Sequence, residues 1–198
     1  MDADYLLMRE AAEKGTLGKV FEIESRVTGS RGIPEGWRQY KVAGGGMSAD
    51  AYHLTAPDPE GKGAKKSMLD AVADAGLKVE DIDYVNVHGT STPVGDIAEI
   101  KGLFAAFGDH IYNLNISSTK SMTGHLLGAA GSIEALACVM ALTKGIVPPT
   151  INNENLDPNI DPKLNLTLNV AQKRDVKCAL SNTFGFGGHN STVVLKKM

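Results

Sequence analysis

The chain has 198 residues, which is enough for one domain, or for one domain and a fragment. Hydrophobic residues make up 42% and charged residues 22% of it, so the chain can bury a core and is not globally disordered. Lysine and arginine number 20 against 23 aspartates and glutamates, a net charge of −3. This balance disfavours a nucleic-acid partner, because neutralising phosphates requires a basic face.

Helix and strand patterns alternate along the sequence. In chain order, the predicted helices cover 4–14, 62–75, 94–107 and 124–144. The predicted strands cover 19–27, 83–87, 115–117, 165–169, 178–183 and 191–196, and the glycine-rich stretch 28–46 is predicted to be irregular. The helix over 124–144 is apolar on most of its circumference, which predicts a central position. The alternation predicts an α/β layered fold.

The cysteines, the first residues and the length of the longest apolar stretch indicate in which compartment the protein is expected. Cys138 and Cys178 have apolar neighbours and are predicted to be small buried residues, not a disulfide framework. The sequence contains no CxxC motif and no paired His/Cys spacing, so a zinc site is not expected. The acidic start Met1–Asp4 is not typical of a signal peptide, and the apolar stretch from Leu126 to Leu142 is shorter than the roughly 20 residues of a membrane span. We therefore expect a cytoplasmic protein with no membrane contact.

The first motif with chemical potential follows the predicted strand over 83–87. His88 comes directly after that strand, at its carboxyl end, where open α/β sheets bind ligands. The hydroxyls of Thr90, Ser91 and Thr92 can bond a polar ligand, or they can cap the helix that begins near Val94. The spacing leaves both interpretations open.

The second motif opens the long apolar helix. Lys120 and His125 lie five residues apart there, and the partial positive charge of a helix N-terminus stabilises developing anions. A nearby lysine also favours a neutral imidazole at His125. The alternatives are a core histidine with satisfied hydrogen bonds and a snorkelling lysine. Glu134, on the same helix, needs a cation if it is buried, with Lys120 or a bound ion as candidates; otherwise it is exposed.

The third motif is the glycine-rich segment 181–190, Ser-Asn-Thr-Phe-Gly-Phe-Gly-Gly-His-Asn. An aromatic ring on a glycine hinge can close a pocket, and its peptide N–H can point at an oxyanion. The alternative is a turn with two core phenylalanines. His53 and His110 have no chemical context and are expected on the surface, and His189 is given no role.

Together and in this order, the three motifs resemble the C-terminal half of the β-ketoacyl-acyl-carrier-protein synthases of type II bacterial fatty-acid synthesis. The resemblance runs from about Gly44 to Met198 and includes the segments 46–53 and 147–152. It implies a thiolase-like C-terminal half with a mixed sheet and a central buried helix, preceded by an N-terminal helix–strand segment. It also implies a decarboxylative Claisen condensation. A cysteine thiolate takes an acyl chain, malonyl-carrier protein loses carbon dioxide, and the resulting enolate attacks the thioester.

The resemblance implies a role for each matching residue. His88 and His125 stabilise the enolate oxygen, and Lys120 supports them electrostatically. Two carboxylates, Asp96 and Glu134, belong to the supporting polar network. Thr90 and Thr92 contact pantetheine, and Phe184 is the gating aromatic with its N–H in the acyl oxyanion hole. It further implies acyl carrier protein as a partner and a homodimer. No cofactor is implied beyond the phosphopantetheine arm that carries the substrates.

The sequence departs from this family in its nucleophile. The family places its reactive cysteine in an N-terminal strand-to-helix elbow, and this sequence has no such elbow. Cys138 and Cys178 occupy positions that the family does not use for attack. We therefore expect the isolated chain to be incomplete as a catalyst. The alternative function is a non-catalytic α/β fragment that needs a missing partner half.

The first 43 residues resemble another family. Segments 5–20 and 29–38 are similar to an internal part of the Gfo/Idh/MocA oxidoreductases, although the Gly-rich nucleotide-binding turn of those enzymes is absent. This predicts a division into 1–43, a foreign or inserted piece, and 44–198, the synthase-like domain. A helix, glycine and strand also precede Gly44 in synthases, so an insertion over 28–43 is the alternative.

Overall fold

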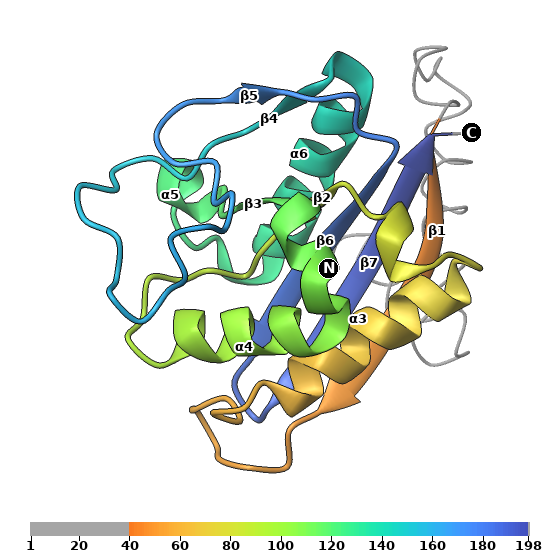
Figure 1. Ribbon diagram of the computed structural model, residues 1–198. Helices are drawn as coiled ribbons and strands as arrows, with labels where there is room; N and C mark the ends of the chain where they lie inside the picture. Colours follow the sequence, from red (N-terminus) through yellow and green to blue (C-terminus); the bar gives the residue numbers. More distant parts are fainter. Residues whose placement is uncertain (1–39, 198) are drawn as a thin grey trace, which may run out of the picture.

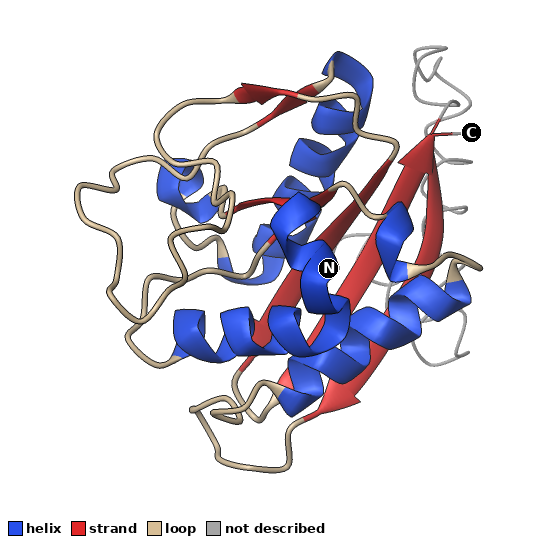
Figure 2. Cartoon of the chain, in the orientation of Figure 1, coloured by secondary structure: helices blue, strands red, loops and turns tan. Residues whose placement is uncertain are grey.

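The computed structural model describes residues 40–197 (Figures 1 and 2). The helices are α3 (Lys62–Asp74), α4 (Gly95–Phe107), α5 (Lys120–Thr123) and α6 (Ala130–Lys144). Short 3-10 turns cover Val79–Asp81, Gly108–Asn113 and Leu127–Ala129. The strands are β1 (Tyr40–Ala49), β2 (Tyr84–Asn86), β3 (Asn115–Ser117), β4 (Ile146–Val147), β5 (Gln172–Lys173), β6 (Cys178–Gly185) and β7 (His189–Lys197).

Five of the strands form one mixed sheet in the order β1-β7-β6-β2-β3. β7 is antiparallel to β1 and to β6, whereas β2 runs parallel to both β6 and β3. The parallel register aligns Asn86 with Ser117 and with Ser181, so the chain leaves all three strands toward the same edge. The three sequence motifs follow these positions and therefore meet at this edge.

Alternating side chains give the sheet two apolar faces. On β2, β6 and β7, Val85, Leu180 and Val194 pack with α3 and α4, while Ala179 and Leu195 pack with α6. Figure 1 shows α3 and α4 together on one side of the long strands and α6 on the other. The sheet is thus the middle layer of an α/β sandwich, as the alternation predicted.

Most predicted elements are confirmed. The helices over 62–75 and 94–107 and the strands over 83–87, 115–117, 178–183 and 191–196 agree with the structure to within two residues. The strand predicted over 165–169 is wrong, because Thr167 and Asn169 have φ near +49° and +60°, which breaks the pleat. Only an isolated bridge between Thr150 and Leu168 remains there.

The glycines of 44–46 lie in a strand and not in an irregular segment, which corrects the prediction for 40–46. A Cβ at Gly46 would overlap the carbonyl group of Ser67, and one at Gly44 would overlap the backbone of α3 at Ala75. The glycines therefore allow α3 to pack directly on the backbone of β1.

The long helix begins later than predicted and is only half covered. Leu127, with φ near +52°, interrupts the helical backbone, and α6 starts at Ala130. One face buries five residues: Ala130, Glu134, Cys138, Ala141 and Leu142. Ile133, Leu136 and Met140 on the opposite face are exposed, so the helix is not the central buried element that was predicted.

Among residues 40–197, one helical stretch, Leu127–Lys144, has the length and apolar composition of a membrane span. The sequence prediction had placed this stretch just short of that limit. Core helices of soluble proteins meet the same criterion, and Glu134 within it is held in a buried ion pair with Lys120.

The helix predicted over 4–14 and the strand over 19–27 lie outside the described residues. The oxidoreductase-like similarity of 2–43 lies almost entirely outside them as well. Strand β1 spans the predicted boundary between 43 and 44, where its register with β7 shifts between Val42 and Gly44. The division into two segments stays a prediction.

Candidate active site

The imidazole rings of His88 and His125 face each other across the edge of the sheet. Their centroids lie 5.4 Å apart with an interplanar angle of 84°. His88 follows β2, and His125 lies in the loop between α5 and α6. Two histidines separated by 37 positions are thus brought to one place by the parallel pairing of β2 with β3.

His88 is held in its neutral form. Its pKa is lowered to about 3, mainly by burial and also by the Lys120 ammonium and His125. Its Nδ1 atom is buried without a hydrogen-bond partner among the described residues. The ring therefore has an unused nitrogen beside the second histidine.

The tautomer of His125 follows from its backbone neighbour. The N–H of Leu127 donates to His125 Nδ1 at 3.1 Å. Since Nδ1 accepts a hydrogen bond, the proton of the neutral ring lies on Nε2. The positive φ of Leu127 belongs to the turn that brings this N–H two residues back to the ring. His125 itself is exposed, so its Nε2–H is available to a ligand.

Lys120 and Glu134 form a buried ion pair. Their side chains are 5% and 2% exposed, and the ammonium donates to Glu134 Oε1. Burial raises the pKa of Glu134, and the Lys120 ammonium offsets part of that rise. The structure thus brings together Lys120, His125 and Glu134, as the sequence predicted, and Glu134 takes the lysine as its partner. Glu134 Oε2 and Ser181 Oγ remain without a hydrogen bond among the described residues.

Glu99 is a site residue that the sequence reasoning missed. Its carboxylate is 4% exposed and accepts the backbone N–H groups of His88 and Gly89, both at 2.9 Å, together with Asn182 Nδ2 at 3.0 Å. Burial raises its pKa, and the three donors oppose that rise. Glu99 precedes the buried Gly102 and Leu103 by three and four positions. A charge in the buried stripe of a helix was therefore the available signal.

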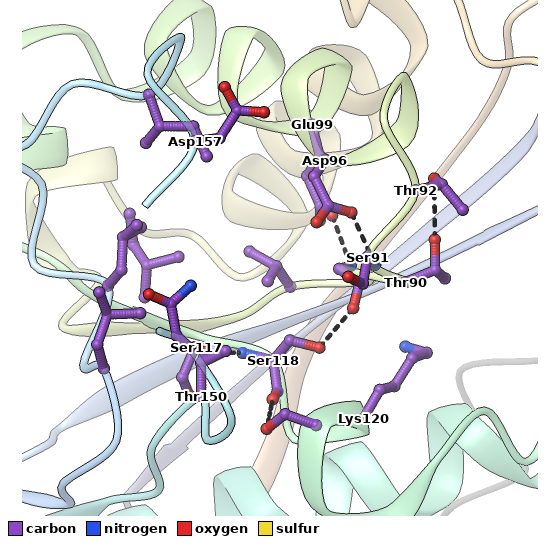
Figure 3. A pocket seen from close by; sticks show the side chains of 18 of the residues that line it. Thr90, Ser91, Thr92, Asp96, Glu99, Ser117, Ser118, Lys120, Thr150 and Asp157 are labelled. Carbon is purple, nitrogen blue, oxygen red and sulfur yellow. Dashed lines mark hydrogen bonds between the residues drawn. The ribbon is translucent and has the colours of Figure 1, made fainter. Parts of the chain in front are cut away.

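His125 lines a cavity of about 700 Å³, and Val87 and Gly89, the neighbours of His88 in the chain, line it as well. Thr90 and Thr92 line it (Figure 3), and their Oγ1 atoms lie 3.2 Å apart. Asp96 also lines it, but its carboxylate accepts the N–H of Ser91 at 3.1 Å and is not hydrogen-bonded to Lys120. Asp96 therefore fixes the 90–92 loop, and its expected place in the polar network that supports Lys120 stays a prediction.

Phe184 lies beside the histidines as part of a strand. Its ring centroid is 5.7 Å from that of His88, and it packs against the core formed with α3 and α4. Phe184 pairs with Asn190 within the β6–β7 hairpin, so it is not a hinge residue. Phe186, between Gly185 and Gly187, is 78% exposed and occupies the turn. The hinge position predicted for Phe184 thus belongs to Phe186.

Neither cysteine lies at the site. Cys138 faces the sheet from α6, is fully buried, and has a thiol pKa raised by burial and by Glu134. Cys178 is the first residue of β6, whose other end carries Phe184 next to His88. Both cysteines are buried, as predicted, and neither is an accessible thiolate at neutral pH.

His53 and His110 have hydrogen-bond partners outside the histidine pair. His53 Nδ1 accepts backbone N–H groups of its own loop, and His110 bonds the carbonyl oxygen of Ile82. Among residues 40–197, no group of three or more His, Cys, Asp or Glu side chains is placed to hold a metal ion.

Residues 40–154, more than half of the chain, match the family described as the C-terminal domain of β-ketoacyl synthases. The chain is 52% identical over 157 residues to the 3-oxoacyl-[acyl-carrier-protein] synthase 2 of Synechocystis sp., an alignment that covers 79% of this chain and 37% of the relative. The Coxiella burnetii protein of the same name is 48% identical, with 80% and 38% covered. The chain thus spans less than two fifths of the length of these relatives.

Solved ketosynthases have the same fold. A β-ketoacyl synthase from Burkholderia phymatum superposes with a TM-score of 0.76 at 33% identity, over 87% of this chain and 40% of that one. The ishigamide ketosynthase/chain length factor superposes with a TM-score of 0.77 at 34% identity, over 87% and 41%. The fold is therefore thiolase-like, and the residues that match the family model, 40–154, include both histidines. The chain belongs to the β-ketoacyl synthase family, of which it carries the C-terminal domain.

Proposed function

We propose that the chain supplies the decarboxylation centre of a 3-oxoacyl-acyl-carrier-protein synthase, an acyltransferase of fatty acid biosynthesis. In this reaction the bond between the α-carbon and the carboxylate of a malonyl thioester breaks, and carbon dioxide leaves. The electron pair forms an enolate whose charge rests on the thioester oxygen. The N–H groups of His88 and His125 stabilise that oxygen. The oxygen then re-forms the carbonyl as the α-carbon bonds to the carbonyl carbon of an acyl thioester, whose C–S bond breaks and releases the thiolate. The 5.4 Å separation of the two rings carries this proposal.

Lys120 has a supporting role in this proposal. Its ammonium disfavours protonation of His88, so the ring stays a neutral hydrogen-bond donor throughout the reaction. Glu134 fixes the ammonium beside the rings through the buried ion pair. A lysine held in this way stabilises an enolate without itself transferring a proton.

The proposed substrate is carried by acyl carrier protein. A solved relative with a TM-score of 0.78 and 31% identity, covering 86% of this chain and 41% of its own, is a type II polyketide ketosynthase in complex with its acyl-carrier protein. Thr90 and Thr92 line the cavity next to the histidines and present two hydroxyls suited to the amides of a pantetheine arm. No further cofactor is proposed, a homodimer is the proposed assembly, and the cytoplasm is the proposed compartment.

Acyl transfer needs a nucleophile that the described residues do not offer. Cys138 is fully buried, and Cys178 begins β6 at the end away from Phe184 and His88. We propose that the attacking cysteine belongs to the part of the relatives for which this chain has no counterpart. Phe186, flanked by glycines at the turn, is the proposed gating aromatic in place of Phe184.

Incubation with malonyl-acyl carrier protein, followed by intact-mass analysis, tests the proposal. We expect conversion to acetyl-acyl carrier protein without an acyl adduct on the chain. A stable adduct on Cys138 or Cys178 would show that the nucleophile has been wrongly placed. No conversion above the uncatalysed rate, with the chain folded and binding the carrier protein, would refute the decarboxylation centre.

A second candidate is a non-catalytic fragment that needs a partner half. The exposed apolar side chains of α6 favour it, because a lone soluble domain rarely leaves Ile133, Leu136 and Met140 together in water. Concentration-dependent association without decarboxylation would support this candidate. A monomeric chain that unfolds cooperatively and decarboxylates malonyl-acyl carrier protein would exclude it.

A further inference from the structure

A chain of buried polar side chains crosses the molecule and ends at His88. Ser67 Oγ on α3 lies 3.0 Å from Thr192 Oγ1 on β7. Thr192 Oγ1 donates to Asn182 Oδ1 on β6 at 2.9 Å, and Asn182 Nδ2 donates to Glu99 on α4 at 3.0 Å. These four residues are at most 4% exposed. We propose that Thr192, which makes no contact with the reacting groups, is a positioning residue for His88.

The direction of the hydrogen bonds makes Thr192 decisive. Glu99 already receives two backbone N–H groups, so an ionised carboxylate there can only accept, and Asn182 must turn its Nδ2 toward it. Asn182 Oδ1 then faces Thr192, whose hydroxyl must be the donor. Ser67 has one proton to share between Thr192 and the carbonyl of Ala64, which lies 3.0 Å away. The donors of Thr192 and Asn182 thus both point toward the carboxylate.

Removing the hydroxyl of Thr192 frees the amide of Asn182. The amide oxygen loses its donor in a site without solvent, and leaving a buried acceptor unsatisfied is costly. Rotation of the amide restores no partner, because it turns Oδ1 toward the carboxylate of Glu99, which can only accept. The carboxylate would then lose a donor and move, and with it the two N–H groups that fix the turn carrying His88.

We call the hydrogen-bonded series Ser67, Thr192, Asn182 and Glu99 the relay. Its role rests on the proposed function, since positioning His88 matters only if His88 acts on a substrate. Thr192→Val keeps the shape of the side chain and removes the hydroxyl, whereas Thr192→Ser keeps the hydroxyl. Thr167→Val is the matched control. Thr167 is 1% exposed, and its hydroxyl accepts Asn115 Nδ2 at 3.0 Å, outside the relay.

Two measurements test the relay, both on folded protein checked by urea unfolding. In 1H–15N spectra we expect Thr192→Val to shift the amide protons of His88 and Gly89 upfield, because their hydrogen bonds to the carboxylate weaken. For decarboxylation we expect about a tenfold loss in kcat with KM changed less than twofold. Thr192→Ser should restore both values to within threefold of the unmodified chain, and Thr167→Val should change neither.

The outcomes separate the relay from the function. Unchanged His88 and Gly89 amides in Thr192→Val, or equal shifts in Thr167→Val, overturn the relay even if the chain decarboxylates its substrate. A shift of the His88 and Gly89 amides that occurs in Thr192→Val and not in Thr167→Val supports the relay even if no variant shows activity. In that case only the proposed function fails. A loss of kcat in Thr192→Val that Thr192→Ser does not restore also overturns the relay.

Discussion

Replacing Glu99 with glutamine tests how the turn that carries His88 is built. The carboxylate accepts three hydrogen bonds, from His88 N–H and Asn182 Nδ2 at Oε1 and from Gly89 N–H at Oε2. A glutamine oxygen at the Oε1 position keeps the first two bonds but sets an NH2 group against the N–H of Gly89. One hydrogen bond to a charged acceptor is lost and two donors oppose each other, a cost of about 2–4 kcal/mol. Relief of the desolvation that raises the Glu99 pKa offsets part of this cost and leaves roughly 1–3 kcal/mol.

Urea unfolding followed by circular dichroism measures that loss, and decarboxylation of malonyl-acyl carrier protein measures the displacement of His88. We expect Glu99→Gln to unfold at a lower urea concentration with an unchanged m-value and to lose about tenfold or more in kcat. Lys101→Gln is the control, because Lys101 lies on the exposed surface of the same helix and pairs there with Glu60, which is outside the helix. The reasoning would be refuted if the free energy of unfolding of Glu99→Gln lay within ~0.5 kcal/mol of that of the unmodified chain, which is the spread of neutral surface changes, and if the variant were equally active.

Three further predictions concern the described residues. The pKa of His88 is about 3 in the folded chain and about 6.5 in an unfolded chain, so the unfolded state binds more protons between these pH values. The free energy of unfolding should therefore fall by up to roughly 4 kcal/mol as the pH drops from 6.5 to 3. Urea unfolding of His88→Gln across this pH range should lack this fall. Gly46→Ala should destabilise the chain by at least ~2 kcal/mol in thermal unfolding, because a Cβ there overlaps the carbonyl of Ser67, and a neutral result would contradict the packing of α3 on β1. Leu136→Lys should reduce ANS fluorescence and self-association. Val170→Lys, at an even more exposed position outside α6, should not, and equal effects would remove α6 as the origin of the apolar surface.

The convergence of the site was predictable from sequence because parallel strands carry information about position. His88 follows β2, and Lys120 follows β3, so pairing of the two strands brings the following loops to one edge of the sheet. The partner of Glu134 was predictable for a different reason: a carboxylate among apolar neighbours needs a cation, and Lys120 was the cation at the start of the same segment.

Other features depend on contacts that no local pattern encodes. The three glycines of 44–46 are typical of a turn, yet close approach by α3 makes them part of a strand. The sequence of α6 is apolar on most of its circumference, which predicted a central position, but burial depends on what covers a helix, and one face of α6 is left exposed. Glu99 and Thr192 act through residues far apart in sequence, which only the folded sheet brings together.

The central claim is that two neutral imidazoles share one negatively charged oxygen. The rate at which malonyl-acyl carrier protein becomes acetyl-acyl carrier protein, measured by intact mass for His88→Leu, His125→Leu and the double variant, tests it most directly. Each single variant should lose about 100-fold or more, and the double variant should lose little beyond that, because the two donors act as a unit. A single variant that keeps its rate within threefold of the unmodified chain would contradict the claim.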